Sequence, residues 1–228
     1  MRLDKYLADM KAGTRSSVKE LIRKGRVSVN GEIIKDAGKK IETTDEIRID
    51  GELLTYVEYE YILLNKPQGY VCALEDRRYP VVMELLETKR KDLVPVGRLD
   101  VDTEGVLLLT NDGMLNHKLL APKSHVDKKY YAEVDRDIPE EAAELFSQEM
   151  DLGDFISKPA HLEILDKRKA FLTIQEGKFH QVKRMFEKIG CTVTYLKRVS
   201  FGPLELKDLS VGGYRSLSEE EIEALKNT

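Results

Sequence analysis

The stretch "VGRLDVDTEGVLLLTNDG", residues 96–113, is the part of the sequence that decides the fold. Its residues 97–100 predict a tight turn, and the apolar run 106–110 that follows predicts a buried strand. Asp100 therefore projects from a loop that a rigid strand holds in place, which suits a functional carboxylate. Aspartate in a turn also commonly accepts a hydrogen bond from a neighbouring backbone N–H. The turn alone leaves both interpretations of Asp100 open.

Outward from this stretch, the pattern mixes strands and helices without regular alternation. Apolar runs predict strands at 61–64, 93–96, 130–134, 161–165, 170–175 and 192–199. Helical spacing predicts helices at 113–121, at 138–146 (opened by Pro139), at 179–189, and after a capping box of Ser218 and Glu221. This arrangement favours an α+β fold with a mixed, largely antiparallel sheet flanked by helices.

The first 58 residues read as a separate small domain, so we predict domains at 1–58 and 59–228. Helices are predicted at 2–10 and 17–24, the second capped by Thr14 or Ser16, and strands at 47–49 and 53–57. Asn30-Gly31 predicts a hairpin turn, because both of its central positions require positive φ. Basic residues lie off the apolar stripe of the second helix or beside it: Arg15, Lys19, Arg23, Lys24 and Arg26.

Charge is unevenly distributed along the 228 residues, whose formal net charge is −4. Residues 1–40 contain 11 Lys and Arg against 5 Asp and Glu, and residues 177–198 contain 6 against 1. Residues 41–58 contain 1 basic and 6 acidic residues, and residues 133–154 contain 1 and 9. A polyanion senses charge within about 8–10 Å at physiological salt, so the two basic segments keep a nucleic-acid partner open despite the negative total. Each charge run could equally be an ordinary solvated surface.

Several other classes of protein are disfavoured. The sequence has only two cysteines, Cys72 and Cys191, which suits a reducing compartment. No apolar run approaches the length of a membrane span, and the charged N-terminus is unlike a signal peptide. We therefore expect a cytoplasmic protein. The four histidines lack metal-ligand spacing, so no metal is expected. Asp100 and Asp102 would face opposite ways in an extended segment, which disfavours a paired-carboxylate glycosidase.

Two groups of motifs resemble known families. "MRLDKYL" and "SSVKELIRKGRVSVNG", with Arg15, Val18, Ile22, Gly25 and Asn30 in register, resemble the RNA-binding module named after ribosomal small-subunit protein four. Residues 97–113 are similar to the signature G-R-L-D-x-x-T-x-G-L-L-L-L-T-x-D-G of the RsuA/RluB-type pseudouridine synthases of ribosomal RNA, with Val106 in place of one leucine. Three further blocks agree with that family: "LLNKPQGYVC" (63–72), "KKYYAEV" (128–134) and "EGKFHQVKRMFEKIG" (176–190).

The resemblance implies a role for individual residues. Asp100 would be the catalytic aspartate, and Lys183 would be its cationic partner, at a position where related enzymes often have Arg. Tyr130 would be the active-site tyrosine, and Tyr131 would lie on the opposite face of the same strand. Because the reaction detaches and rejoins uracil without redox change, no cofactor is implied. Arg98 would act in flipping the uridine out of the RNA. Further RNA contacts are expected from Lys66, Lys178, His180, Gln181 and Arg184, with the five basic residues of the small domain.

The resemblance also implies a substrate. "MRLDKYL" and "LLNKPQGYVC" look closest to the small-subunit branch, which isomerises one uridine of 16S rRNA, expected at position 516. We therefore expect a monomer that acts on 16S rRNA in an assembling small-subunit particle, with no membrane partner. The alternatives are a synthase that acts on 23S rRNA, and a non-catalytic RNA-binding or ribosome-binding protein of the same fold.

Overall fold

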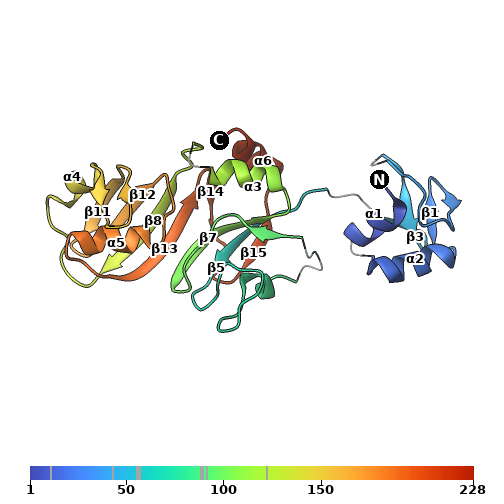
Figure 1. The fold of residues 1–228 in the computed structure, drawn as a ribbon, viewed down its shortest axis with the longest axis horizontal. Coiled ribbons are helices and arrows are strands. Elements are labelled where there is room, and N and C mark those ends of the chain that lie inside the picture. Colours follow the sequence, from blue (N-terminus) through green and yellow to red (C-terminus); the bar gives the residue numbers. More distant parts are fainter. Residues whose placement is uncertain (11, 43, 55–57, 88–89, 91, 122) are drawn as a thin grey trace. The chain divides into compact units, whose positions relative to one another are not determined.

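The computed structural model describes residues 1–228 apart from 11, 43, 55–57, 88–89, 91 and 122. These residues form two compact units, drawn in Figure 1, and each unit has its own hydrophobic core. The first unit comprises Met1–Tyr59 with Thr88–Asp92, and the second comprises Glu60–Glu87 with Leu93–Thr228.

The first unit packs two helices on a four-stranded antiparallel sheet of order β2-β1-β3-β4. Its core contains Tyr6 and Leu7 from the first helix and Val18 and Ile22 from the second. Thr14, one of the two predicted caps, accepts the hydrogen bond that starts the second helix. The predicted hairpin is confirmed, and the end of the predicted strand 53–57 lies outside the described residues. The elements are α1 (Leu3–Asp9), α2 (Arg15–Arg23), β1 (Val27–Val29), β2 (Glu32–Ile33), β3 (Ile47–Ile49) and β4 (Glu52–Leu54).

The second unit is built on a nine-stranded sheet, whose main path has the order β11-β12-β8-β13-β7-β5-β15. Along this path β13 pairs with β7 in parallel and the other neighbouring strands pair antiparallel, so the predicted α+β fold with a mixed sheet is confirmed. The strands of the main path are β5 (Tyr61–Lys66), β7 (Thr103–Thr110), β8 (Lys128–Val134), β11 (His161–Asp166), β12 (Lys169–Ile174), β13 (Val193–Phe201) and β15 (Tyr214–Ser216). The other elements are η1 (Val82–Leu85), β6 (Val94–Pro95), α3 (Gly113–Leu120), α4 (Ala142–Phe146), β9 (Met150–Asp151), β10 (Ile156–Ser157), α5 (Gln181–Lys188), β14 (Leu204–Glu205) and α6 (Glu219–Lys226).

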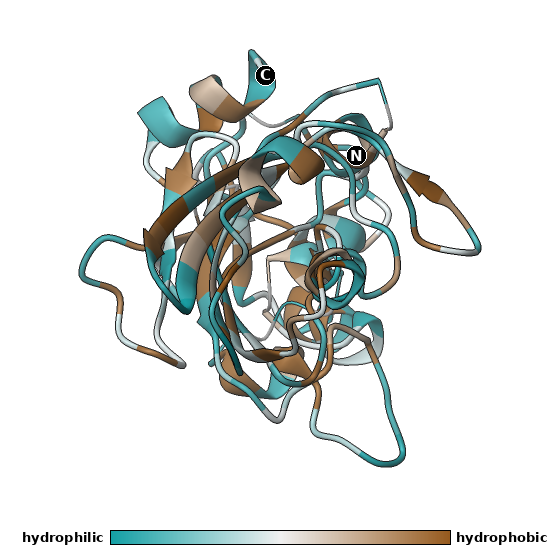
Figure 2. Ribbon diagram, turned by 90° about the vertical axis from the view of Figure 1, so that its left-hand side faces the viewer, coloured by the Kyte–Doolittle hydropathy of each residue, from teal (hydrophilic) through white to brown (hydrophobic). Residues whose placement is uncertain are grey.

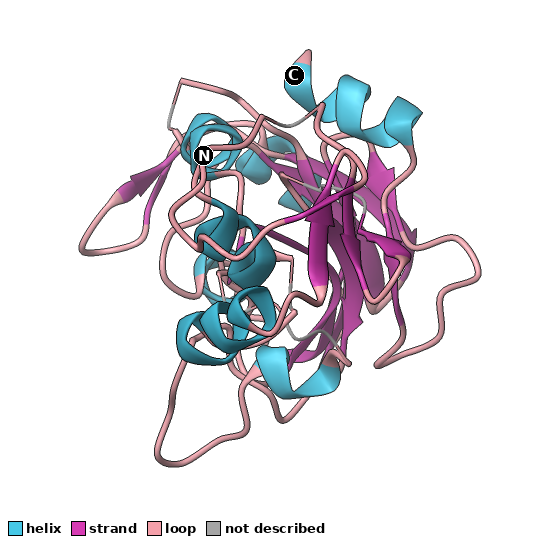
Figure 3. Ribbon diagram, turned by 90° about the vertical axis from the view of Figure 1, so that its right-hand side faces the viewer, coloured by secondary structure: helices cyan, strands magenta, loops and turns pink. Residues whose placement is uncertain are grey.

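Both faces of the central strands are buried, which explains why β5 and β7 are almost continuously apolar. Successive side chains of a strand point to opposite faces. Leu107 and Leu109 belong to one core with α5, while Val106 and Leu108 belong to a second core with α3 and α6. Helices accordingly flank the strands, as Figure 3 shows, and the long loops are largely hydrophilic in Figure 2.

Two helices begin later than the sequence pattern predicts. Helix α4 begins at Ala142 rather than at 138, because Pro139 opens a turn in which its carbonyl accepts from Ala142 N. Helix α5 begins at Gln181 rather than at 179, because His180 adopts a left-handed backbone conformation with φ of 51°. The capping box of Ser218 and Glu221 is confirmed at the start of α6.

Candidate active site

The turn before β7 is held in place by a buried lysine, Lys66, at the end of β5. Its side chain is fully buried, and its Nζ donates to the carbonyl oxygens of Pro67 (3.0 Å), Asp100 (3.0 Å) and Thr103 (2.8 Å). Burial lowers the pKa of Lys66, against smaller opposing effects of nearby acidic groups. The three donors of the ammonium group are thus matched by three acceptors. The expectation that Lys66 contacts RNA is wrong, because the group is enclosed and its function is to position the turn.

The backbone of the turn is further fixed on both sides. Leu99 N donates to the Sγ of buried Cys72 at 3.3 Å, and Gly69 N donates to Val101 O at 2.7 Å. Gly97 has φ of +73°, and a side chain there would meet Leu120 at 3.2 Å from its Cβ. The turn is therefore rigid, and it presents the Asp100 carboxylate in one direction.

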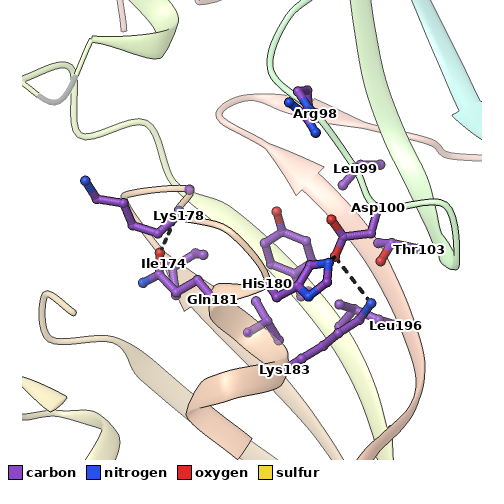
Figure 4. Close-up of a pocket in the computed structure, with 13 residues that line it drawn as sticks. Arg98, Leu99, Asp100, Thr103, Ile174, Lys178, His180, Gln181, Lys183 and Leu196 are labelled. Atoms are coloured by element: carbon purple, nitrogen blue, oxygen red, sulfur yellow. Dashed lines mark hydrogen bonds and ion pairs between the residues drawn. The ribbon is translucent and has the colours of Figure 1, made fainter. Parts of the chain in front are cut away.

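Asp100 lies against two cationic or potentially cationic groups of the next motif. Lys183 Nζ on α5 lies 3.3 Å from Asp100 Oδ2, and His180 Nε2 lies 3.7 Å from the same oxygen. Figure 4 shows the three side chains converging, with Lys183 below the carboxylate and His180 beside it. The Asp100 and Lys183 side chains are 32% and 18% exposed, so the pair is partly shielded from water but open to a ligand.

Asp102 joins the same cluster, contrary to the sequence-based expectation. Lys183 Nζ donates to Asp102 Oδ1 at 2.6 Å, so both carboxylates contact one ammonium. Residues 101–102 form a turn rather than an extended segment, and for that reason the two side chains do not face opposite ways. Burial opposes ionisation of Asp102, but the hydrogen bond and charge of Lys183 outweigh it and lower the pKa of that carboxyl. The D-x-D spacing is the signal in the sequence that points to Asp102.

Tyr130 on β8 forms another wall of the site. Tyr130 is 7% exposed, and its hydroxyl has no hydrogen-bond partner among the residues that the structure describes. Tyr131 lies on the opposite face, where its hydroxyl donates to Glu133 at 2.6 Å, so the predicted alternation is confirmed. A free hydroxyl and an aromatic ring are thus available to a ligand beside Asp100.

These groups line a cavity of about 60 Å³ that opens to solvent. Ile174, Val182 and Leu196 give it an apolar part, and most of its other lining residues are polar or charged. His180 and Lys183 lie beside Asp100, whereas Arg98 and Lys178 lie farther from it (Figure 4). Phe179, which the motif analysis missed, is 68% exposed at this loop and its ring stacks on His180 at 3.8 Å.

The remaining predicted RNA contacts of the second unit divide into two groups. Arg98 and Lys178 are exposed and line the cavity, and Figure 4 places Arg98 apart from the Asp100 cluster. Gln181 is buried and lines the cavity, and its amide donates to Glu176 and accepts from Lys178 N, so it supports the loop. Arg184 points away from the cavity and bonds to Leu152 O and Asp154.

In the first unit, basic side chains gather on the exposed side of α2. Arg15 and Arg23 have no ion-pair partner within the described part of the chain, and Lys19 lies 4.0 Å from Asp4. Lys24 pairs with Glu20 at 2.8 Å. Arg26 forms a two-nitrogen pair with Asp50, which leaves it less available to a phosphate.

The described residues contain no cluster of three His, Cys, Asp or Glu side chains suited to a metal ion. Over the same residues, no helix has the length and apolar character needed to cross a membrane.

Comparison with known proteins identifies the two units. A family model described as RNA pseudouridylate synthase matches residues 60–188, and an S4 domain model matches residues 1–47. The ribosomal small subunit pseudouridine synthase A of Pasteurella multocida is 43% identical, over 97% of this chain and 98% of that protein. The protein of the same name from Escherichia coli K12 is 39% identical, over 97% and 98%. A solved crystal structure of a pseudouridylate synthase is 40% identical, covers 99% of both chains and has a TM-score of 0.71. The chain therefore belongs to the RNA pseudouridine synthase family of enzymes and has an S4 domain at its N-terminus.

Proposed function

We propose that this chain converts one uridine of 16S ribosomal RNA to pseudouridine, as a cytoplasmic monomer acting on an assembling small-subunit particle. The relatives named as small-subunit synthases support this choice of substrate, since they align with nearly the whole chain. The observation that carries the chemistry is the contact of Asp100 with Lys183 in a solvent-open cavity beside Tyr130.

The reaction is an isomerisation, so its atoms balance within the substrate. The bond between uracil N1 and ribose C1′ breaks, the base turns, and a bond forms between C5 and C1′. The proton on C5 leaves and N1 gains a proton, without redox change or an external group. The protein must supply one ionised carboxylate, a surface on which the base turns, and a group that moves a proton.

Asp100 is the carboxylate in this proposal. An aspartate serves as nucleophile or base only when it is ionised, and a nearby cation favours that form. Lys183 lies 3.3 Å away and is itself anchored by Asp102 at 2.6 Å, so its ammonium stays in place when the substrate binds. A lysine makes a point-charge contact, and a single nitrogen here reaches both carboxylates.

Tyr130 and Arg98 complete the site. The Tyr130 ring provides a face on which the uracil stacks, and its free hydroxyl lies in the same cavity for proton transfer. Arg98 is exposed two residues before Asp100, where it holds the RNA while the uridine is flipped out of its stack.

Residues 1–58 dock the RNA in this proposal, while residues 59–228 perform the reaction. Arg15, Lys19 and Arg23 are exposed along α2, and lysine or arginine at such positions binds phosphate and sugar rather than base edges.

Deletion of the gene in the source organism, followed by mapping of pseudouridine in both rRNAs, tests the function. We expect loss of one 16S site, its restoration by the wild-type gene, and no restoration by Asp100→Asn. Asp208→Asn is the matched control, because Asp208 is an exposed aspartate of the same unit outside the cavity.

Each other result has a definite meaning. Loss of a 23S site would replace the 16S substrate with a large-subunit one. Retention of every site would leave an RNA-binding protein that does not catalyse this reaction in the cell. Restoration by Asp100→Asn would remove Asp100 from the catalytic role.

A further inference from the structure

A second cleft adjoins the cavity of Asp100. Its volume is about 500 Å³, and it shares Arg98, Tyr130, Gly177 and Lys178 with the first cavity. An RNA strand with one nucleoside beside Asp100 can therefore continue into this second cleft, past the Tyr130 ring.

Two buried cations form the floor of the second cleft. Lys128, on β8, is 8% exposed, and Arg198, on the neighbouring β13, is 2% exposed. Both lie against the ring of Phe201, with Lys128 Nζ at 5.6 Å and Arg198 Cζ at 5.1 Å from its centroid. The sheet thus holds two positive groups side by side below the cleft.

Neither cation is fully satisfied by the protein. Lys128 Nζ donates to Val126 O at 2.8 Å and has a long contact of 3.5 Å with Gln175 O. Arg198 donates through Nε to Val106 O at 2.7 Å, and its two terminal nitrogens bond to no group among the residues that the structure describes. An arginine has five N–H donors, so most of this guanidinium remains available to an acceptor in the cleft.

The charged side chains that line the cleft are mainly cationic. Arg98, Lys158 and Lys178 add three cations to the floor pair, and Glu176 is the one carboxylate among the described lining residues. One Glu176 oxygen already accepts from Lys158 N and from Gln181 Nε2. Burial, followed by repulsion from Arg198, lowers the pKa of Lys128 to about 8, although Asp127 and Glu176 oppose this. Buried cations without a counter-charge destabilise a fold, and a bound anion relieves that cost.

We propose that the second cleft binds a backbone phosphate of the nucleotide next to the target uridine, with Lys128 and Arg198 as its ligands. The proposal deepens the proposed function and rests on it, because the phosphate belongs to the RNA whose uridine occupies the Asp100 cavity. A phosphodiester suits the site, since the terminal nitrogens of Arg198 match phosphate geometry and Lys128 supplies a point charge.

The test compares Lys128→Met with Lys129→Met. Lys129 is the next residue of β8, points to the other face and pairs with Glu163 at 3.3 Å, so it is a matched control. Binding of a 16S rRNA fragment is measured over a range of salt concentrations. We expect Lys128→Met to bind about ten-fold more weakly or worse, as for the loss of a charged hydrogen bond. Its salt slope is expected to fall by about 0.7, the value for one phosphate of a single strand. Lys129→Met is expected to match the wild-type chain.

A second arm locates the phosphate. Neutral methylphosphonate linkages are placed one at a time around the target uridine. We expect one position at which the neutral linkage weakens wild-type binding as much as Lys128→Met does, with no further loss in the variant. Arg198→Lys, which keeps the charge but loses the planar fork, is expected to weaken binding at the same position.

Three outcomes separate the possibilities. If Lys128→Met keeps the wild-type salt slope while remaining folded, the cleft does not bind an RNA phosphate and the proposal is wrong. Competition by inorganic phosphate without any sensitivity to neutral linkages would make the cleft a site for a free anion, which also overturns it. Absence of pseudouridine formation by the wild-type chain would instead refute the proposed function, because that readout is independent of the salt slope.

Discussion

Replacing Lys128 with methionine should make the folded protein more stable at neutral pH. Its pKa falls from 10.5 to about 8 on folding, and at about 1.4 kcal/mol per pKa unit this is a cost of ~3 kcal/mol. Methionine fills a similar volume without a charge, but it loses the hydrogen bond to Val126 O, which is a loss of about 1 kcal/mol. We therefore expect the variant to be more stable by ~2 kcal/mol at pH 7.

The sign of the pH dependence follows from the same residue. Because the folded pKa lies below the unfolded one, the cost is present below about pH 8 and disappears as the pH rises toward 10.5. Groups that act on Lys128 are Arg198, which lowers its pKa, and Asp127 and Glu176, which raise it; all remain in the variant. The stability difference between the two chains should therefore shrink as the pH rises.

Urea unfolding of both chains, followed by circular dichroism at pH 7 and near pH 9.5, measures this difference. The reasoning is refuted if the variant is less stable at pH 7, or if the difference between the chains is the same at both pH values. Lys129→Met serves again as the control, because its side chain is partly exposed and already paired.

Substitutions at four residues in and around the catalytic turn have distinct expected outcomes. Asp100→Asn should abolish release of the C5 proton from labelled RNA while RNA affinity changes by less than about three-fold, because the shape of the side chain is kept. Lys183→Arg should retain measurable turnover in that assay and Lys183→Met should not, since the cation is required beside the carboxylate. Lys66→Met should lower the thermal midpoint and slow turnover without altering the salt slope of RNA binding, because three buried carbonyls lose their donor. Arg98→Ala should weaken RNA binding and slow turnover together, as measured by anisotropy and proton release; unchanged values for both would remove Arg98 from base flipping.

The sequence predicts the central strands and the candidate carboxylate well, for a physical reason. Strand β7 is buried on both faces, so its apolar run is unbroken, and the turn before it is marked by Gly97. The side chains that converge on Asp100 come from residues much later in the chain, Tyr130, His180 and Lys183, and their approach depends on how strands pair. The family resemblance, rather than spacing, indicated Lys183 and Tyr130.

The failures of prediction share a different cause. Lys66 and Gln181 are polar residues in basic motifs, and the pattern cannot tell whether such a side chain faces RNA or bonds internally to backbone and loop groups. The start of α5 was misplaced because the left-handed conformation of His180 interrupts an otherwise helical pattern. Asp102 lies on the same side as Asp100 because residues 101–102 form a turn, whereas an extended chain would place the two on opposite sides.

The parallel pairing of β7 with β13 has a consequence for the time at which activity arises during synthesis. Residues 103–105 pair with residues 196–198, more than ninety residues later, and β13 follows directly after the helix that carries Lys183. Domains form as units as the chain emerges, and contacts of long sequence separation form late. A nascent chain that has passed α5 but not β13 has both catalytic groups but lacks the strand that joins β7 to β8. We therefore expect this protein to become catalytically active only after the last quarter of its chain has left the ribosome that makes it.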